Sequence, residues 1–131
     1  MPRKPSPTLT DAELRLMEVL WNKERATVAD IVGALPPPPV HYSTVLTTMR
    51  ILERKGFVRH HEDGRTYVYE ATVDRDAAAD SALGHVVKKF FRNSPTSLAL
   101  RLVSKERPSR EELEHLKTLI DQYEDEEDAR G

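Results

Sequence analysis

The chain has 131 residues, 38% of them hydrophobic and 32% charged, with a formal net charge of −2 at pH 7 and no cysteine. This length allows one compact domain or two very small ones, and the modest hydrophobic content makes a large monomeric core difficult to build. The absence of cysteine excludes disulfides and thiolate metal ligands. No apolar run is long enough to cross a bilayer and the N-terminus lacks the apolar core of a signal peptide, so we expect a cytoplasmic protein without membrane insertion.

The small net charge hides an uneven distribution. Residues 1–72 contain ten Lys and Arg against nine Asp and Glu, whereas residues 73–131 contain ten against thirteen. Much of the acidic excess lies between Glu124 and Asp128, which we expect to belong to a solvated tail over residues 124–131. Residues 41–65 carry five Lys and Arg, three acids and three histidines. Binding of phosphate by this region should therefore be moderate and strongly salt-dependent.

The first part of the chain predicts a flexible arm over residues 1–8 and then two helices. The arm is proline-rich and carries Arg3 and Lys4; such arms can reach a DNA groove, but most are simply tails. Thr10 and Glu13 have the spacing of a capping box that opens a helix ending near Asn22. The apolar stripe of that helix is Leu14, Met17, Leu20 and Trp21.

A short second helix and a proline run follow. Thr27, with Asp30 three residues later, caps a helix whose apolar positions are Val28, Ile31, Val32 and Leu35. The four prolines at 36–39 end it and keep the chain extended before the next helix. This order is that of a helix-turn-helix unit: a helix, a short helix, a connection and a third helix. The connection here is longer than usual.

The third helix, predicted over His41–Lys55, has two contrasting faces. Val45, Met49 and Leu52 recur at i, i+4 and i+7 and form the apolar stripe. Small hydroxyls and guanidinium groups occupy the opposite stripe, which consists of Ser43, Thr47, Arg50 and Arg54. Small polar side chains allow close approach to a surface, and arginine donates in a fork to phosphate or guanine. This face suits a DNA major groove, although an ordinary solvated helix face has the same general pattern.

A β-hairpin is predicted directly after this helix. Gly56 is a natural helix stop, and Asp63-Gly64 is a strong turn signal between the strand-forming segments 57–62 and 65–69. A hairpin behind a recognition helix is a wing, with Arg65, His61 and His60 near its tip. The two histidines are otherwise a surface pair, since the five histidines of the chain follow no metal-ligand spacing. We therefore expect no metal and no cofactor.

From Asp74 onward the pattern is helical only. Asp74 or Asp76 caps a helix to about Phe91, with Ala78, Ala82, Val86 and Phe90 among its inward positions. Ser94-Pro95 and the Ser109–Glu112 capping box open two more helices. Three short helices cannot close a core alone, so we expect them to pair with a second copy, the alternative being that they pack back on the wing domain. The candidate dimerisation residues are Leu83, Val86, Val87, Phe90, Leu98, Leu102, Leu113, Leu116, Ile120 and Tyr123.

These patterns predict a mostly α fold with a small β-wing (α+β). Residues 1–72 form a winged helix-turn-helix DNA-binding domain, and residues 73–131 form a three-helix dimerisation domain. No nucleophile–base pair, glycine-rich phosphate loop or metal cluster is present, so we expect neither an enzyme nor a small-molecule substrate. A winged-helix adaptor that binds an acidic protein with the same helix face remains the alternative to a DNA-binding protein.

The chain resembles the penicillinase repressors of the BlaI/MecI/CopY type from about Leu9 to Tyr123. The resemblance is carried by many short pieces in order: Leu9-Thr10 with Glu13, Met17, Leu20-Trp21, Ala26-Thr27-Val28, Tyr42–Thr47, Leu52, Lys55-Gly56, Gly64-Arg65, Tyr67–Tyr69, Ser94-Pro95 and the stretch 109–116. It implies a cytoplasmic homodimeric repressor that binds a palindromic, double-stranded DNA operator. It also implies release through a membrane sensor-protease pathway, triggered by a β-lactam, that leads to cleavage in the dimerisation domain.

Two departures from that family pattern matter. The scissile bond of the family aligns with Arg101-Leu102, where better-known members carry Asn-Phe, so the cleavage trigger is in question here. Arg50-Ile51 stands where a polar residue followed by arginine is expected, and Arg50 can take over the missing contact. The copper-responsive branch ends in a cysteine-rich motif, which this chain lacks.

The DNA interface is predicted to have three parts. Bases or adjoining phosphates would be contacted by Ser43, Thr44, Thr47 and Arg50, with Thr48 beside them. The backbone would be held by Tyr42, Arg54, Lys55 and Arg65, and His61 would lie near the tip of the wing.

Overall fold

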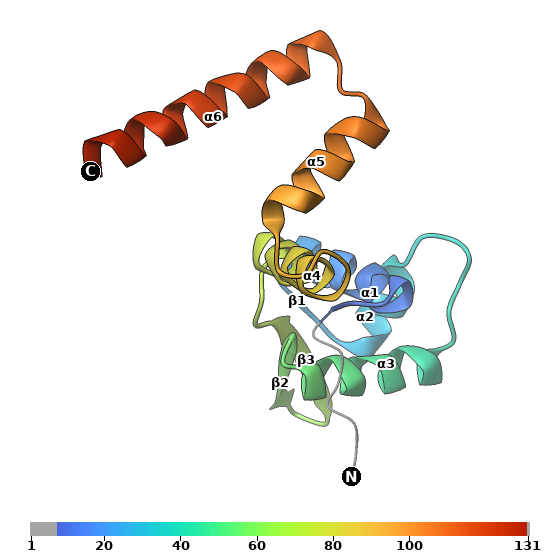
Figure 1. Ribbon diagram of the computed structural model, residues 1–131. Helices are drawn as coiled ribbons and strands as arrows, with labels where there is room; N and C mark the ends of the chain where they lie inside the picture. Colours follow the sequence, from blue (N-terminus) through green and yellow to red (C-terminus); the bar gives the residue numbers. More distant parts are fainter. Residues whose placement is uncertain (1–7, 131) are drawn as a thin grey trace. The chain divides into compact units, whose positions relative to one another are not determined.

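The computed structural model describes residues 8–130, and within them it contains six helices and three short strands (Figure 1). Their order is α1 (Asp11–Lys23), β1 (Arg25–Ala26), α2 (Val28–Ala34), α3 (Tyr42–Lys55), β2 (Val58–Asp63), β3 (Thr66–Ala71), α4 (Arg75–Phe90), α5 (Pro95–Glu106) and α6 (Arg110–Arg130). This is the expected α+β composition. The arm expected over residues 1–8 lies outside the described residues except for Thr8.

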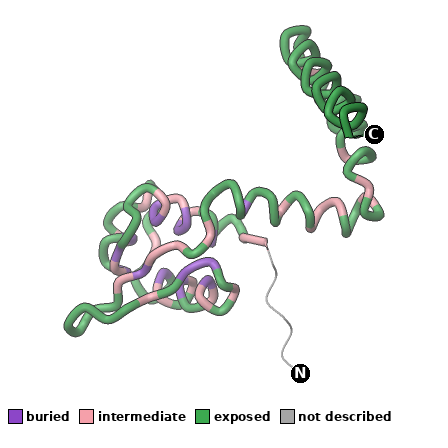
Figure 2. The backbone as a smooth tube through the Cα atoms, turned by 90° about the vertical axis from the view of Figure 1, so that its left-hand side faces the viewer, coloured by how far each residue is buried: buried purple, intermediate pink, exposed green. Residues whose placement is uncertain are grey.

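The contacts divide the chain into two compact units, one ending at Val86 and the other beginning at Val87. The division falls inside α4, so that most of this helix belongs to the first unit. Buried residues occur only in the first unit among the described residues, as the purple segments in Figure 2 show. Each unit is described here by itself.

The core of the first unit is formed by α1, α2, α3 and the sheet. The side chains that lose all or nearly all contact with solvent are Met17, Leu20, Ile31, Val45, Met49, Leu52 and Tyr69. The predicted stripe of α3 is thus confirmed at all three positions. Burial of such side chains contributes about 1.5–3 kcal/mol each to folding. The stripe predicted for α1 was wrong at Leu14, which is 41% exposed; Leu16 and Val19 are buried instead.

Local capping explains where the helices begin. Thr10 and Glu13 exchange hydrogen bonds between side chain and backbone, as do Thr27 and Asp30. Ser109 and Glu112 do the same at the start of α6. These boxes satisfy amide groups that the first helical turn leaves unpaired. All three were predicted from the sequence spacing, and the structure confirms them.

The connection between α2 and α3 is fixed to α1 by one arginine. Arg15 donates from Nη2 to the carbonyl oxygens of Pro36 at 2.7 Å and Pro38 at 3.1 Å. Proline has no amide hydrogen, but its carbonyl remains an acceptor. These hydrogen bonds hold the proline-rich connection against α1. They thereby fix where α3 begins relative to α1.

The sheet is antiparallel with strand order β1-β3-β2. Asp63 pairs with Thr66, so the loop of the hairpin is Gly64-Arg65 and not the predicted Asp63-Gly64. Gly64 has a φ of 65°, a left-handed conformation that glycine adopts without strain. The strand β1, which was not predicted, adds two residues to β3 through the pairs Arg25 with Glu70 and Ala26 with Tyr69.

The start of α4 is fixed on α1. The Trp21 indole Nε1 donates to the carbonyl of Val73 at 2.9 Å, Arg75 pairs with Glu18, and Ala78 is buried. Phe90, expected to face inward on the same helix, is 69% exposed, so that prediction was wrong for the isolated chain.

In the second unit, α5 and α6 have no buried residues. Ser94 caps α5 by accepting from the amide of Ser97, with Pro95 in its first turn, as predicted. Residues 124–130, predicted to be part of a solvated tail, are exposed but continue α6 as helix. The structure therefore shows two amphipathic helices whose apolar sides are uncovered in the single chain.

Candidate nucleic-acid interface

The recognition helix α3 presents its polar face to solvent. Val45, Met49 and Leu52 hold the opposite face in the core, so the direction of the polar face is fixed by packing. The predicted contact residues on this face are all exposed: Tyr42, Ser43, Thr44, Thr47, Arg50 and Arg54. Thr48, which was included beside them, is half-buried. The two flanks of the helix therefore differ, and Thr48 lies toward the protein.

The hydroxyl groups of α3 are paired within the helix. Thr47 Oγ1 donates to the Ser43 carbonyl at 2.9 Å, and Thr48 Oγ1 donates to the Thr44 carbonyl at 2.8 Å. Each hydroxyl oxygen keeps lone pairs that can accept a further hydrogen bond. Thr47 is an exposed residue, so its hydroxyl can accept from a base amino group without giving up its bond to the helix.

The guanidinium groups of the interface are available to a ligand. Arg50 and Arg54 extend from α3, and Arg65 occupies the loop of the wing. None of the three forms an ion pair with another residue in the part of the chain that the structure describes. Unpaired arginines on one surface are suited to phosphate or to the guanine edge, since the fork of donors matches both.

A cavity of about 570 Å³ separates the recognition helix from the wing. It is lined on one side by Tyr42, Leu46 and Arg50 and on the other by Glu62, Gly64, Arg65, Thr66 and Tyr67, with the N-terminal end of α2 (Thr27–Ala29) contributing as well. In this arrangement the helix and the wing flank a concave surface. A winged helix can then contact a DNA groove with the helix and the DNA backbone with the wing. His61, also predicted, is exposed on β2.

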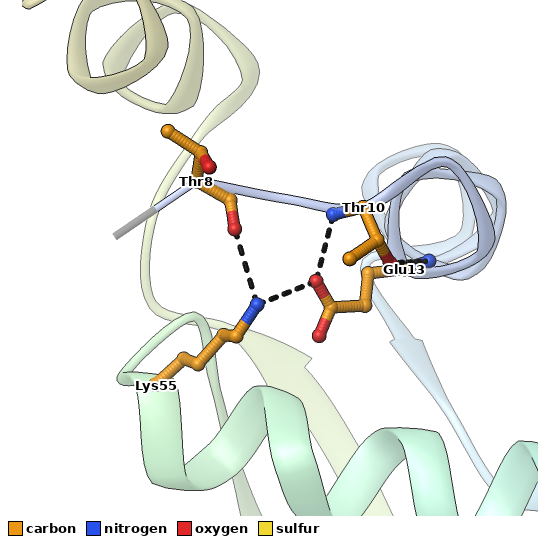
Figure 3. Close-up of polar contacts among 4 residues, drawn as sticks. All are labelled: Thr8, Thr10, Glu13 and Lys55. Atoms are coloured by element: carbon orange, nitrogen blue, oxygen red, sulfur yellow. Dashed lines mark hydrogen bonds and ion pairs between the residues drawn. The ribbon is translucent and has the colours of Figure 1, made fainter. Parts of the chain in front are cut away.

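Lys55, predicted to contact the DNA backbone, has its ammonium already paired inside the protein. Its Nζ donates to Glu13 Oε1 at 2.7 Å and to the Thr8 carbonyl at 3.1 Å, as Figure 3 shows. The Lys55 and Glu13 side chains are only 6% and 5% exposed. Moving this buried ammonium to an exposed phosphate would leave the Glu13 carboxylate buried without its partner, which is strongly unfavourable. Lys55 is therefore a structural residue.

The hydrogen bonds that Glu13 accepts favour its carboxylate form. Burial by itself raises the pKa of the Glu13 carboxyl, but the hydrogen bond from Lys55 and those from Thr10 outweigh this effect. The pKa of Glu13 consequently lies below its usual value. The carboxylate thus caps α1 and pairs with α3 at the same time, which fixes the angle between these helices.

The outer face of the wing carries a second charged group. Arg59 Nε donates to Glu70 Oε1 at 2.6 Å, and Arg25 of β1 lies 3.7 Å from the other carboxylate oxygen. The hydrogen bond from Arg59 is the main reason that the pKa of Glu70 is lowered. These arginines are exposed, so the pair contributes little to stability. Its effect is to join all three strands at one point.

The sequence did not single out a cluster on the inner face of the wing. His60 was predicted to lie near the tip of the wing, with a surface pair as the alternative. It is instead half-buried and pairs with Tyr69 of β3, with its Nδ1 2.7 Å from Glu53 Oε1 and its ring stacked on Tyr67. Tyr69, below it, is buried, and burial raises the pKa of its phenol. The alternation along β2 and β3 was the available signal, since it places these side chains on one face of the hairpin.

The candidate dimerisation residues are accessible in the single chain. Half-buried positions are Val86, Val87 and Leu98; exposed ones are Leu83, Phe90, Leu102, Leu113, Leu116, Ile120 and Tyr123. Leu83 and Val86 belong to the first unit and the others to the second. Arg101 and Leu102, the candidate cleavage site, are exposed in the middle of α5, and the Arg101 guanidinium lies 6.0 Å from the centre of the Phe91 ring.

Neither a metal site nor a membrane span is found in the described part of the chain. Between Thr8 and Arg130, no three His, Asp or Glu side chains lie together in a way that could hold a metal ion. Of the helices in the same range, none is both long enough and apolar enough to cross a bilayer.

Known proteins match this chain over most of its length. The sequence model of the penicillinase repressor family matches residues 9–122. The penicillinase repressor of Bacillus licheniformis is 24% identical over 121 residues, covering 92% of this chain and 94% of the relative. The methicillin resistance regulatory protein MecI of Staphylococcus aureus is 24% identical over 113 residues, covering 86% of this chain and 92% of the relative. The solution structure of the DNA-binding domain of the repressor BlaI has a TM-score of 0.49 and 28% identity, covering 59% of this chain and 93% of that domain.

The family match begins before α1 and ends within α6, so it includes the helix-turn-helix, the wing and the C-terminal helices. The chain belongs to the penicillinase repressor family, a family of DNA-binding transcriptional repressors that are not enzymes.

Proposed function

We propose that this protein is a homodimeric repressor that binds a palindromic DNA operator through α3 and the wing. The observation that carries the proposal is the joint surface of α3 and the wing, where Arg50 and Arg65 line one cavity and neither has an internal ion-pair partner in the described chain. Membership of the family supports DNA as the ligand.

The roles of individual residues follow from their places on this surface. Ser43, Thr44, Thr47 and Arg50 occupy the exposed face of α3 and would lie in the major groove. Tyr42, Arg54 and Arg65 lie around it and would contact phosphates, with His61 at the wing as a further backbone contact. Thr48 would have a minor part because it is half-buried.

The uncovered apolar residues of α4–α6 support assembly with a second copy. Phe90, Leu119, Ile120 and Tyr123 are each more than half exposed. Several large apolar side chains left exposed favour an interface, since their contact with water is unfavourable. A twofold dimer would present two recognition helices to half-sites separated by about 34–36 Å or a multiple of it.

Release from DNA would then follow loss of the dimer. We propose cleavage between Arg101 and Leu102 as the release step, within a membrane sensor-protease pathway. Both residues are exposed, but they lie within α5, so a protease would need that helix to open locally. With this regulation we also propose that the protein acts in the cytoplasm.

The experiment that tests the proposed function measures fluorescence anisotropy of the purified protein on labelled DNA from upstream of its own gene. Shuffled DNA of the same composition is the comparison, and both are titrated across a salt series. Tight, selective binding with a steep negative log–log salt slope is the expected result. Equal weak binding to both DNAs, together with salt-sensitive binding to an acidic protein partner, would establish the adaptor function instead.

A further inference from the structure

The recognition helix contains one carboxylate, Glu53, one turn after Arg50. A negative charge at this place opposes the approach of phosphate. The Glu53 carboxylate is held by His60 of β2, whose Nδ1 lies 2.7 Å from Oε1 and 2.8 Å from Oε2. Their side chains are 34% and 31% exposed, so the contact lies at the margin between core and surface.

The same histidine is stacked on an aromatic ring of the wing. The centres of the His60 and Tyr67 rings are 4.3 Å apart and their planes differ by 25°. Tyr69 lies on the other strand directly opposite His60 and meets its ring at 5.5 Å with a tilt of 48°. Contacts to α3 and to β3 therefore leave the imidazole little freedom to turn.

Tyr67 is the member of this cluster that faces the DNA side. It is 43% exposed, and it lines the cavity between α3 and the wing together with Arg50 and Arg65. Tyr69, in contrast, is 1% exposed and belongs to the core. A phenol at the edge of such a cavity can donate to a phosphate oxygen, as tyrosine often does on DNA.

We propose that Tyr67 contacts the sugar–phosphate backbone of DNA and that His60 is its positioning residue. Glu53 of α3 holds the His60 ring, and the His60 ring in turn orients the Tyr67 ring. This inference rests on the proposed function. It adds Tyr67 to the interface and gives His60, which the sequence placed only near the wing tip, a defined role. The ion pair or hydrogen bond with Glu53 fixes the imidazole, and the stacked imidazole fixes the Tyr67 ring. The wing and the recognition helix then meet DNA as one prearranged surface, which lowers the ordering cost of binding.

The test is a double-mutant cycle on operator affinity with His60→Ala and Tyr67→Ala. Removal of His60 alone would also leave Glu53 as an unpaired carboxylate near DNA. The cycle is therefore run in a Glu53→Gln background, where the amide oxygen still accepts from Nδ1 but no charge is left behind. Tyr67→Ala should weaken operator binding roughly tenfold and His60→Ala roughly fivefold, while the double variant should be no weaker than Tyr67→Ala.

Two matched variants separate positioning from folding. His61→Ala removes the neighbouring histidine, which is exposed on the opposite face of β2, and its effect should add to that of Tyr67→Ala. His60→Phe keeps a flat ring against Tyr67 and loses only the donor to Glu53. Because the ring is then no longer held by residue 53, it should recover only part of the affinity lost in His60→Ala. Thermal unfolding of each variant identifies any loss that comes from a destabilised wing.

The outcomes distinguish the two proposals. Additive effects of His60→Ala and Tyr67→Ala on selective binding would overturn the positioning role while leaving the repressor function intact. An unchanged affinity in Tyr67→Ala would overturn the DNA contact. If the unsubstituted protein does not select operator over shuffled DNA, the proposed function itself fails and these roles fail with it.

Discussion

The Nζ of Lys55, at the last turn of α3, lies 2.7 Å from Oε1 of Glu13, in the first turn of α1. Both side chains are almost fully removed from solvent, and the Thr8 carbonyl accepts a second hydrogen bond from the same ammonium (Figure 3). The recognition helix is thereby attached to the rest of the domain by a pair of charges at one end and by the apolar stripe along its length. A change at this pair should alter folding and leave the DNA surface chemically unchanged.

Lys55→Met should destabilise the protein by about 3–5 kcal/mol, because it leaves the Glu13 carboxylate buried without its partner. Urea unfolding followed by circular dichroism measures this, as a lower midpoint with an unchanged slope. Arg54→Met, one residue earlier but exposed, is the matched control and should change stability little. Equal midpoints for the two variants would show that the Lys55–Glu13 pair does not stabilise the fold.

The lowered pKa of Glu13 predicts a dependence of stability on acid. A carboxyl with a lower pKa in the folded state binds fewer protons there than in the unfolded chain, so stability rises with pH in that range. The contribution is complete above the unfolded value of about 4.3 and is lost as the pH falls through the folded value. Glu13→Gln should make the free energy of unfolding less dependent on pH below about 5. Glu62→Gln, on the exposed wing, serves as the control and should keep the slope of the unsubstituted protein.

Arg50 and Arg54 should have different effects on DNA binding although both are exposed arginines on α3. Arg50→Ala should cost about 1–3 kcal/mol on the operator and relax the preference at one base pair, if Arg50 contacts a base edge. Arg54→Ala should weaken operator and shuffled DNA alike and reduce the salt slope by about 1, as loss of a phosphate contact does. Anisotropy titrations on both DNAs measure these quantities. Identical losses on specific and shuffled DNA for both variants would contradict the assignment.

The sequence predicted the features that depend on local spacing. The α3 stripe, the three capping boxes and the Gly56 stop, with φ 88°, each involve residues within a few positions of one another. It could not predict that Lys55 is buried, because its partner Glu13 lies 42 residues earlier and only the packing of α1 on α3 brings them together. Sequence patterns identify lysine as a cation but not whether its charge is already satisfied.

The other differences have similar causes. Two residues are too few for a periodic pattern, so β1 was missed, and its pairing with β3 depends on the path of the chain after α1. The one-residue error in the hairpin loop came from the Asp63-Gly64 signal, whereas the cross-strand pairing places Asp63 in β2. The contacts of His60 could not be predicted because they come from α3 and from the opposite strand, which are distant in the sequence or paired only in the folded hairpin. The boundary between the domains and the roles of Leu113 and Tyr123 in dimerisation stay predictions.

Glu24 offers a test of backbone strain after α1. Its φ of 68° and ψ of −47° lie in a region that residues with a side chain rarely adopt, and its amide still donates to the Leu20 carbonyl. Glu24→Gly should raise the free energy of unfolding by about 1 kcal/mol, because glycine reaches this conformation without steric strain. Glu24→Ala removes the same carboxylate but keeps the Cβ, so it should give no such gain. A lower unfolding midpoint for Glu24→Gly than for Glu24→Ala would show that the backbone here is unstrained.

Leu116→Asp should separate DNA recognition from assembly. Leu116 lies on α6 and is 37% exposed in the single chain. None of the described residues of the second unit is buried. A carboxylate placed in an apolar interface between two copies would be desolvated without a partner, so the dimer should dissociate. Sedimentation velocity should then show a monomer, and affinity for the full operator should fall while binding to an isolated half-site persists. Lys117→Asp, at the adjacent exposed position, is the control for the added negative charge. A Leu116→Asp variant that stays dimeric would exclude this side of α6 from the interface and direct the search to Phe90 and α5.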